Sequence, residues 1–154
     1  MPSDETFMYQ YKYPRPMVCT DVALFERHSD GETHILLIQR GNAPFAGHWA
    51  LPGGFVEMDE DLHVAARREL AEETGIEIGD LIQVGAFGDP LRDPRGRNIS
   101  VAFAAVASAP LSPRAGDDAA AATLFSLGAL PDLAFDHEMI INSAVDALKL
   151  RGKW

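Results

Sequence analysis

The residues with the clearest chemical potential are three glutamates in the stretch RRELAEETG: Glu69, Glu72 and Glu73. On a helix that turns ~100° per residue, measured from Leu62, Glu69 falls near ~340°, Glu73 near ~20° and Glu72 near ~280°. The apolar residues around Leu62 and Leu70 define the same arc, with Glu72 at its edge. The glutamates are therefore predicted to point toward the protein.

Carboxylates in that position need a partner. An ionised carboxylate that leaves water unpaired is heavily penalised, so such groups take up a proton, pair with a cation or bind a metal. Arg68 precedes Glu72 by four residues and could bridge it, but one arginine cannot neutralise three acids, and Arg67 points away, near ~140°. A hard divalent cation, Mg²⁺ or Mn²⁺, suits carboxylate oxygens and the backbone carbonyls of Gly53 or Gly54. A solvated acidic face is the alternative, and the helical wheel argues against it.

The negative charge of the chain is concentrated around the same stretch. The formal net charge is −10, and residues 57–80 hold nine acids against two bases, which is −7 of that total. Such a segment repels itself unless cations neutralise it. Binding to nucleic acid needs clustered lysine and arginine instead, so we expect no nucleic-acid partner.

Length and composition indicate one domain. The 154 residues are predicted to form a single domain over 1–154, with residues 1–16 as an N-terminal arm. The single cysteine, Cys19, excludes an internal disulfide and is interpreted as a small buried hydrophobe. The acidic N-terminus is unlike a secretory signal, and no apolar tract approaches the ~18 residues of a membrane-spanning helix. We expect a cytoplasmic location and no membrane partner.

The elements that must position the glutamates alternate between strands and helices. Apolar runs predict strands at residues 17–26 and 34–39 around an Asp-Gly turn, then a Gly- and Pro-rich loop with an extended piece at 49–51. A helix is predicted from Asp59, as its cap with acids in the first turn, to Gly75 as its C′ glycine. Further strands are expected at 76–87, 99–107 and 122–127, and a last helix opens at Asp136 or His137. This order predicts an α/β layered domain with a mixed sheet.

The run from Gly54 to Ile76 resembles the Nudix box, G-x(5)-E-x(7)-R-E-U-x-E-E-x-G-U, where U is aliphatic. The specified positions are filled by Gly54, Glu60, Arg68, Glu69, Leu70, Glu72, Glu73, Gly75 and Ile76. The hairpin before the box and the strand order after it are also similar to the Nudix fold, an α/β/α sandwich with a mixed sheet. The resemblance thus extends over nearly the whole chain.

The resemblance implies hydrolysis of a nucleoside diphosphate linked to another moiety, by attack of water on phosphorus. It implies that Glu69, Glu72 and Glu73 ligate Mg²⁺ or Mn²⁺, with a backbone carbonyl of Gly53 or Gly54 and a contribution from Glu57. It also implies that Arg68 and Glu60 brace the loop against the helix through charge-assisted hydrogen bonds. These residues form the expected metal and catalytic set.

Segments outside the box resemble the Nudix branch that acts on ADP-ribose: YKYPRP, FAGHWALPGGFVE, GDPLRDPRGRNISVAF and FDHE. The products would be AMP and ribose 5-phosphate. The expected substrate-binding residues are Arg92, Arg95 and Arg97, which can take phosphate, and Phe45 and Trp49, which can stack a base. The alternatives are arginines paired with Asp89 and Asp93 in solvent, and aromatic residues in the core.

The general base is left open by the sequence. The downstream acids to test first are Asp117, Asp118 and Glu138, none of them identified by spacing. His48 and His137 could hydrogen-bond the substrate, but a histidine that begins a helix is more often a cap or a surface residue. Both are therefore kept out of the expected catalytic set.

Two rival functions remain at this stage. The first is hydrolysis of nucleoside triphosphates, including oxidised ones, or of nucleotide sugars. The second is a non-catalytic ADP-ribose sensor, as in repressors of NAD metabolism that add a winged-helix DNA-binding domain. We expect no such segment here, because the sequence stops at Trp154 and its acid cluster is intact. The tyrosine-rich arm could cross to a partner in a homodimer.

Overall fold

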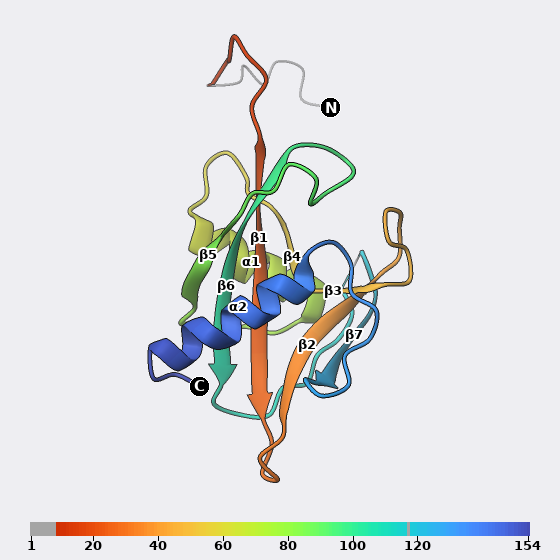
Figure 1. The fold of residues 1–154 in the computed structure, drawn as a ribbon, viewed down its shortest axis with the longest axis vertical. Coiled ribbons are helices and arrows are strands. Elements are labelled where there is room, and N and C mark those ends of the chain that lie inside the picture. The colour runs from red at the N-terminus through yellow and green to blue at the C-terminus, as the bar shows by residue number, and fades with distance from the viewer. Residues whose placement is uncertain (1–8, 117) are drawn as a thin grey trace.

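The computed structural model describes residues 9–116 and 118–154, which fold into a mixed β-sheet with one helix on each face (Figure 1). The strands are β1 (Met17–Arg27), β2 (Thr33–Arg40), β3 (Trp49–Ala50), β4 (Gly53–Phe55), β5 (Ile82–Phe87), β6 (Asn98–Ala107) and β7 (Ala119–Ser126). The helices are α1 (Leu62–Thr74) and α2 (His137–Leu150). The predicted α/β/α sandwich is confirmed.

The strand β1 lies at the centre of the sheet, which explains its apolar sequence. The strand order is β3-β2-β1-β6-β5, with β4 paired to β1 and β7 paired to β2. β1 and β6 run parallel, and the other pairs are antiparallel. Because both faces of β1 are covered, its residues 20–26 are all buried instead of alternating with exposed ones.

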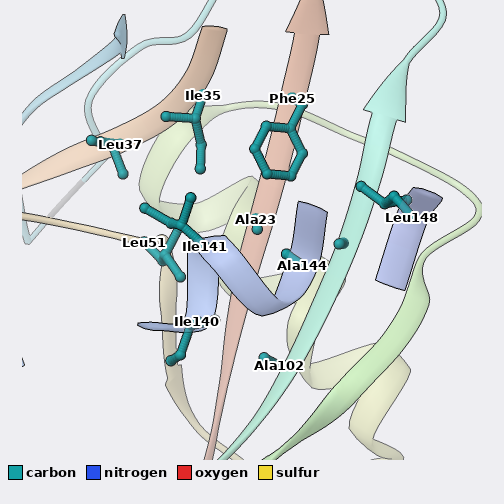
Figure 2. Packing of buried hydrophobic residues seen from close by; sticks show 11 residues of the cluster. Ala23, Phe25, Ile35, Leu37, Leu51, Ala102, Ile140, Ile141, Ala144 and Leu148 are labelled. Atoms are coloured by element: carbon teal, nitrogen blue, oxygen red, sulfur yellow. The ribbon is translucent and has the colours of Figure 1, made fainter. Parts of the chain in front are cut away.

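Two hydrophobic layers hold the helices to the sheet. Since side chains alternate along a strand, Ala23 and Phe25 face α2, whereas Val22 and Leu24 face α1. Figure 2 shows the α2 layer, where Ile140, Ile141, Ala144 and Leu148 pack on the sheet. Full burial of each such aliphatic or aromatic side chain stabilises the fold by roughly 1.5–3 kcal/mol. The two layers fix both helices relative to β1, and therefore fix the residues that they carry.

The first helix begins later than predicted. Asp61, not Asp59, is its N-cap: its carboxylate accepts the backbone N–H of His63 at 2.9 Å, and the first turn contains no acid. The predicted C-terminus is correct, because Gly75 adopts a left-handed conformation with φ 72°. For α2, the prediction of an opening at Asp136 or His137 is correct.

Two strand predictions need correction. Residues 76–81 form no strand, and β5 begins only at Ile82, because Gly79 and Asp80 are poor strand formers. β4 was missed, because its glycine pair was interpreted as loop. A Cβ on Gly53 would lie 2.5 Å from Asp21 Oδ1, so only glycine allows this close pairing with β1.

The described part of the N-terminal arm, residues 9–16, extends beyond the start of β1 (Figure 1), and residues 1–8 lie outside the described part of the chain. Tyr9, Tyr11 and Tyr13 are exposed on it, and a crossing to a second copy stays a prediction. Among the described residues, neither helix has the length and apolar character needed to cross a membrane.

Candidate active site

A cleft of about 350 Å³ lies where β1, β4 and α1 meet the start of α2. One wall carries Gly53 and the box residues Gly54, Phe55, Glu57, Arg68, Glu69 and Glu73. The other polar and aromatic lining residues are Cys19, Asp21, Arg40, Arg92, Asp93, Arg95, Asp118, Phe135 and His137. Carboxylates and guanidinium groups thus line the same cleft.

Arg68 ties the box loop to the helix. Its guanidinium donates to Glu60 at 2.9 and 2.6 Å, and to the carbonyl oxygen of Phe55 at 3.2 Å. The same group donates to Glu69 at 2.8 Å and to Glu72 at 3.2 Å. The hydrogen bonds from Arg68 lower the pKa of Glu60, which also accepts the backbone N–H of Glu57. One arginine therefore connects the loop before α1 to one turn of the helix.

Glu69 packs directly against the backbone of β4. Its side chain is only 14% exposed, and burial raises its pKa in spite of the bond from Arg68. A Cβ on Gly54 would lie 2.5 and 2.6 Å from the two carboxylate oxygens of Glu69. The glycine at this position is needed because the carboxylate occupies the space that a side chain would fill.

Of the three box glutamates, Glu73 is the one without a side-chain partner among the described residues. Burial raises its pKa to about 8, and the nearby negative charges of Glu69 and Asp21 act in the same direction. A backbone hydrogen bond from Gly53 and the charge of Arg40 offset only part of this. Within the described residues, no side chain forms a hydrogen bond or ion pair with the carboxyl of Glu73, so it would gain from a cation in the cleft.

The donor set fits a divalent cation at Glu69 and Glu73. Both lie on the same cleft wall as Gly53 and Gly54, and carboxylate and carbonyl oxygens are the ligands that Mg²⁺ and Mn²⁺ prefer. Glu72 differs, because its side chain is 58% exposed and bonded to Arg68. In residues 9–116 and 118–154, no three His, Cys, Asp or Glu side chains converge on one metal position. Glu72 would join such a site only after releasing Arg68.

Glu57 and the expected arginines lie in different surroundings. Glu57 is 63% exposed and lies at the cleft wall, 3.9 Å from Arg68 Nε. Arg92 is buried and donates to both oxygens of Asp136, at 2.9 and 2.7 Å. Arg95 lines the cleft and donates to both oxygens of Asp93, at 3.0 and 2.8 Å. Arg97 is exposed and is not part of the lining.

The expected base-stacking residues lie outside the cleft lining. Trp49 packs edge-to-face on Phe125, with ring centroids 4.7 Å apart, as part of the α2 layer. Phe45 contacts Phe135, at a centroid distance of 5.0 Å, and Phe135 lines the cleft, as does Phe55. Trp49 therefore packs in the core, which is the alternative to base stacking that the sequence left open.

Sequence reasoning missed Phe135 and Arg40. The guanidiniums of Arg40 and Arg95 lie 4.9 and 5.3 Å from the ring centroid of Phe135. Phe135 has a φ of 51°, a strained value for a residue with a side chain, and such strain gathers at functional sites. The FDHE segment was the available signal for Phe135, whereas nothing local distinguished Arg40 from other arginines.

Some of the downstream acids and histidines lie at the cleft, and others do not. Asp118 lines the cleft, Glu138 is exposed on α2 away from it, and Asp117 lies outside the described residues. His48 is not part of the lining, whereas His137 is buried at the cleft together with Asp21, a residue that sequence reasoning did not single out. Cys19 is half-buried at the cleft and donates to the carbonyl of Ile99; burial raises its pKa to about 11.

A mixed sheet between two helices, with the box glutamates at a cleft, defines the class of this protein. A family model described as NUDIX domain matches residues 16–144, and the chain belongs to the NUDIX family. It is 46% identical to the ADP-ribose pyrophosphatase of Methanocaldococcus jannaschii over 130 residues, which cover 84% of this chain and 73% of that protein. Within the family it is a Nudix pyrophosphohydrolase.

Other relatives combine this domain with further sequence. The chain is 43% identical to the ADPR responsive transcriptional repressor NtrR of Acinetobacter baylyi over 109 residues, 68% of this chain and 43% of the repressor. The NUDIX domain of Shewanella oneidensis NrtR, solved with ADP-ribose, is 32% identical with a TM-score of 0.84, covering 92% of this chain and 94% of that one.

A metal is present in another similar structure. The bifunctional NMN adenylyltransferase/ADP ribose pyrophosphatase of Francisella tularensis, solved with AMP and a manganese ion, is 31% identical with a TM-score of 0.75. The match covers 89% of this chain and 43% of that one. Nudix enzymes generally use divalent metals, in agreement with the oxygen donors on the cleft wall.

Proposed function

We propose that this chain hydrolyses ADP-ribose to AMP and ribose 5-phosphate with Mg²⁺ or Mn²⁺. The observation that carries the proposal is the carboxyl of Glu73, largely withdrawn from water beside Glu69 and without a side-chain partner in the described residues. A bound cation would remove that mismatch and attract a diphosphate to an otherwise acidic wall. The similarity to an ADP-ribose pyrophosphatase over 84% of this chain supports the choice of substrate.

The residues of the chain take distinct parts in this reaction. Glu69 and Glu73 hold the metal, with a carbonyl of Gly53 or Gly54, and Glu72 and Glu57 are further ligand candidates. A bound divalent cation lowers the pKa of water and stabilises negative charge on the leaving phosphate. Arg68 positions Glu69 through their 2.8 Å hydrogen bond.

Arginines of the cleft lining would bind the anionic substrate. Arg40 and Arg95 flank Phe135 at the cleft, and their guanidiniums can each take a phosphate oxygen. Asp118 is the downstream acid at the cleft and is our first candidate to accept the proton of the attacking water. Arg92 orients Asp136 and the start of α2 through its Nε and Nη2, and its remaining N–H groups at the cleft keep it a candidate to bind phosphate.

A non-catalytic sensor of ADP-ribose is the second candidate. The similarity to NtrR and to an ADP-ribose-bound NrtR domain favours keeping it. The complete set of box glutamates favours the enzyme, because a sensor has no need for a metal-activated water. A hydrolase of nucleoside triphosphates, including oxidised ones, or of nucleotide sugars is the remaining alternative.

One assay separates these functions. The protein is incubated with ADP-ribose and Mg²⁺ or Mn²⁺, with and without excess EDTA, and AMP and ribose 5-phosphate are quantified. Metal-dependent release of AMP is expected. Release of pyrophosphate or of a sugar phosphate from a nucleotide panel, without AMP release from ADP-ribose, contradicts the substrate assignment. Binding of ADP-ribose without turnover in any metal supports the sensor.

A further inference from the structure

The floor of the cleft contains a buried histidine whose protonation state is set by its hydrogen bond. His137 is 3% exposed, and the backbone N–H of Leu51 donates to its Nδ1 at 2.9 Å. A backbone N–H can only donate, so Nδ1 must carry the lone pair and the proton must be on Nε2. Burial also lowers the pKa of His137, which favours the neutral ring. His137 therefore presents a fixed N–H donor.

That donor faces a carboxylate that it does not reach. His137 Nε2 lies 3.6 Å from Asp21 Oδ1, beyond the range of a normal hydrogen bond. The other oxygen of Asp21 accepts the hydroxyl of Ser100 at 2.5 Å and lies 4.0 Å from Arg92 Nη2. In the part of the chain that the structure describes, neither Nε2 nor Oδ1 has another hydrogen-bond partner.

The pair thus offers one donor and one acceptor side by side at the cleft. Both residues line it, and both are held from behind: His137 by Leu51, and Asp21 by Ser100. A hydroxyl group can both accept and donate a hydrogen bond at a single oxygen, so one sugar hydroxyl can satisfy both partners. Buried polar groups that are left unfilled are costly, so the pair should discriminate strongly for a ligand that supplies a hydroxyl.

We propose that Asp21 and His137 together recognise one ribose hydroxyl of the substrate, with His137 Nε2–H donating to the hydroxyl oxygen and the hydroxyl proton directed to Asp21 Oδ1. This inference rests on the proposed function, because ADP-ribose supplies the hydroxyl groups. It assigns sugar recognition to the floor of the cleft, apart from the metal ligands on its wall. A structural role, in which His137 only caps the N–H of Leu51, predicts a different outcome for the variants below.

Two substitutions of His137 test the roles of the two ring nitrogens separately. The side-chain oxygen of asparagine in His137→Asn can replace Nδ1 and keep the bond from Leu51, but it leaves no donor at the position of Nε2. His137→Gln can keep a donor near Nε2 and loses the acceptor for Leu51. Asp21→Asn provides an independent test, because Ser100 selects the amide oxygen and turns the amide NH₂ toward His137 Nε2–H. His48→Asn is the matched control away from the cleft lining.

The measurement is kcat/KM for ADP-ribose and for analogues that each lack one ribose hydroxyl. The wild type and His48→Asn are expected to disfavour one analogue by about 10²-fold or more. The ratio of kcat/KM for ADP-ribose to kcat/KM for that analogue should fall to within about threefold of unity in His137→Asn and in Asp21→Asn. The reason is that each variant loses the interaction with the hydroxyl, so it turns over ADP-ribose no better than the analogue. The urea midpoint of His137→Asn should stay close to that of the wild type, whereas His137→Gln should unfold more easily.

The outcomes are distinguishable. If the wild type hydrolyses ADP-ribose and His137→Asn discriminates as strongly as it does, the inference is wrong and the proposed function stands. The inference is equally wrong if the wild type tolerates loss of every ribose hydroxyl. No hydrolysis of ADP-ribose by the wild type overturns both. If His137→Asn fails to fold, Asp21→Asn decides by the same ratio.

Discussion

Replacement of Gly54 by alanine tests whether the position of the Glu69 carboxylate matters. The new Cβ would lie 2.5 and 2.6 Å from the carboxylate oxygens, whereas ordinary contacts begin at 3.4 Å. The carboxylate must therefore move by about 0.9 Å, and a displacement of ~1 Å in a catalytic group costs on the order of 10²-fold in rate. The shift also strains the 2.8 Å hydrogen bond from Arg68.

The assay measures kcat/KM for ADP-ribose with Mn²⁺, together with Mn²⁺ affinity by electron paramagnetic resonance. Gly54→Ala is expected to lose about 10²-fold in kcat/KM and to bind Mn²⁺ more weakly, with an overpacking cost of about 1–3 kcal/mol in the free energy of unfolding. Gly79→Ala is the matched control, because no atom lies within 4 Å of its added Cβ. That variant should keep wild-type activity and metal affinity.

Wild-type activity and unchanged Mn²⁺ affinity in a folded Gly54→Ala protein would refute the reasoning. They would mean that the Glu69 carboxylate can move by about an ångström without consequence, and that it does not hold the metal. An equal loss in Gly79→Ala would also refute it, because the effect would then come from the substitution type.

Two further predictions concern buried charges. Glu73→Gln should keep the fold and lose at least ~10²-fold in turnover at saturating Mg²⁺, and substantial activity would remove Glu73 from the ligand set. Folding raises the pKa of Glu73 from 4.5 to about 8, so between these two pH values the folded protein holds a proton that the unfolded chain releases. With the metal removed by EDTA, the free energy of unfolding should therefore fall as the pH rises from 4.5 to about 8. Urea unfolding should show that the free energy of unfolding falls less with rising pH in Glu73→Gln than in the wild type. The exposed control Glu77→Gln should show the wild-type pH dependence. Arg92→Lys cannot donate to both oxygens of Asp136 and should lower the free energy of unfolding by about 1–3 kcal/mol, against about 0.5 or less for the exposed control Arg97→Lys. Equal urea midpoints for those two variants would contradict the structural role of Arg92.

The orientation of the box glutamates could be predicted because helix geometry is local. A turn of ~100° per residue places Glu69 and Glu73 on the face of Leu70 whatever the rest of the chain does. For Glu72 the prediction of an inward side chain is wrong: the wheel puts it only at the edge of the buried arc, and its side chain is 58% exposed. The late start of α1 was harder to predict, because Asp59 and Asp61 are both suitable caps and the path of the preceding loop selects between them.

The partners of the charged loop residues could not be predicted. Arg92 and Asp136 are 44 positions apart, and Asp21 and His137 lie on β1 and α2. Whether a loop arginine is buried or exposed depends on which segments the sheet order brings together. The parallel pairing of β1 with β6 carries the loop before β6 to the start of α2, and a helical or strand period contains no information on that pairing.

The amino-acid sequence by itself determined the family, the α/β class and the inward face of the acidic helix, because these depend on spacing along the chain. Only the tertiary structure decided that Arg68 spans four partners, that Trp49 belongs to the core, and that the cleft floor is formed by Asp21 and His137. The physical reason is that hydrogen bonds and burial between distant residues depend on how the strands pair and on how both helices pack against the sheet.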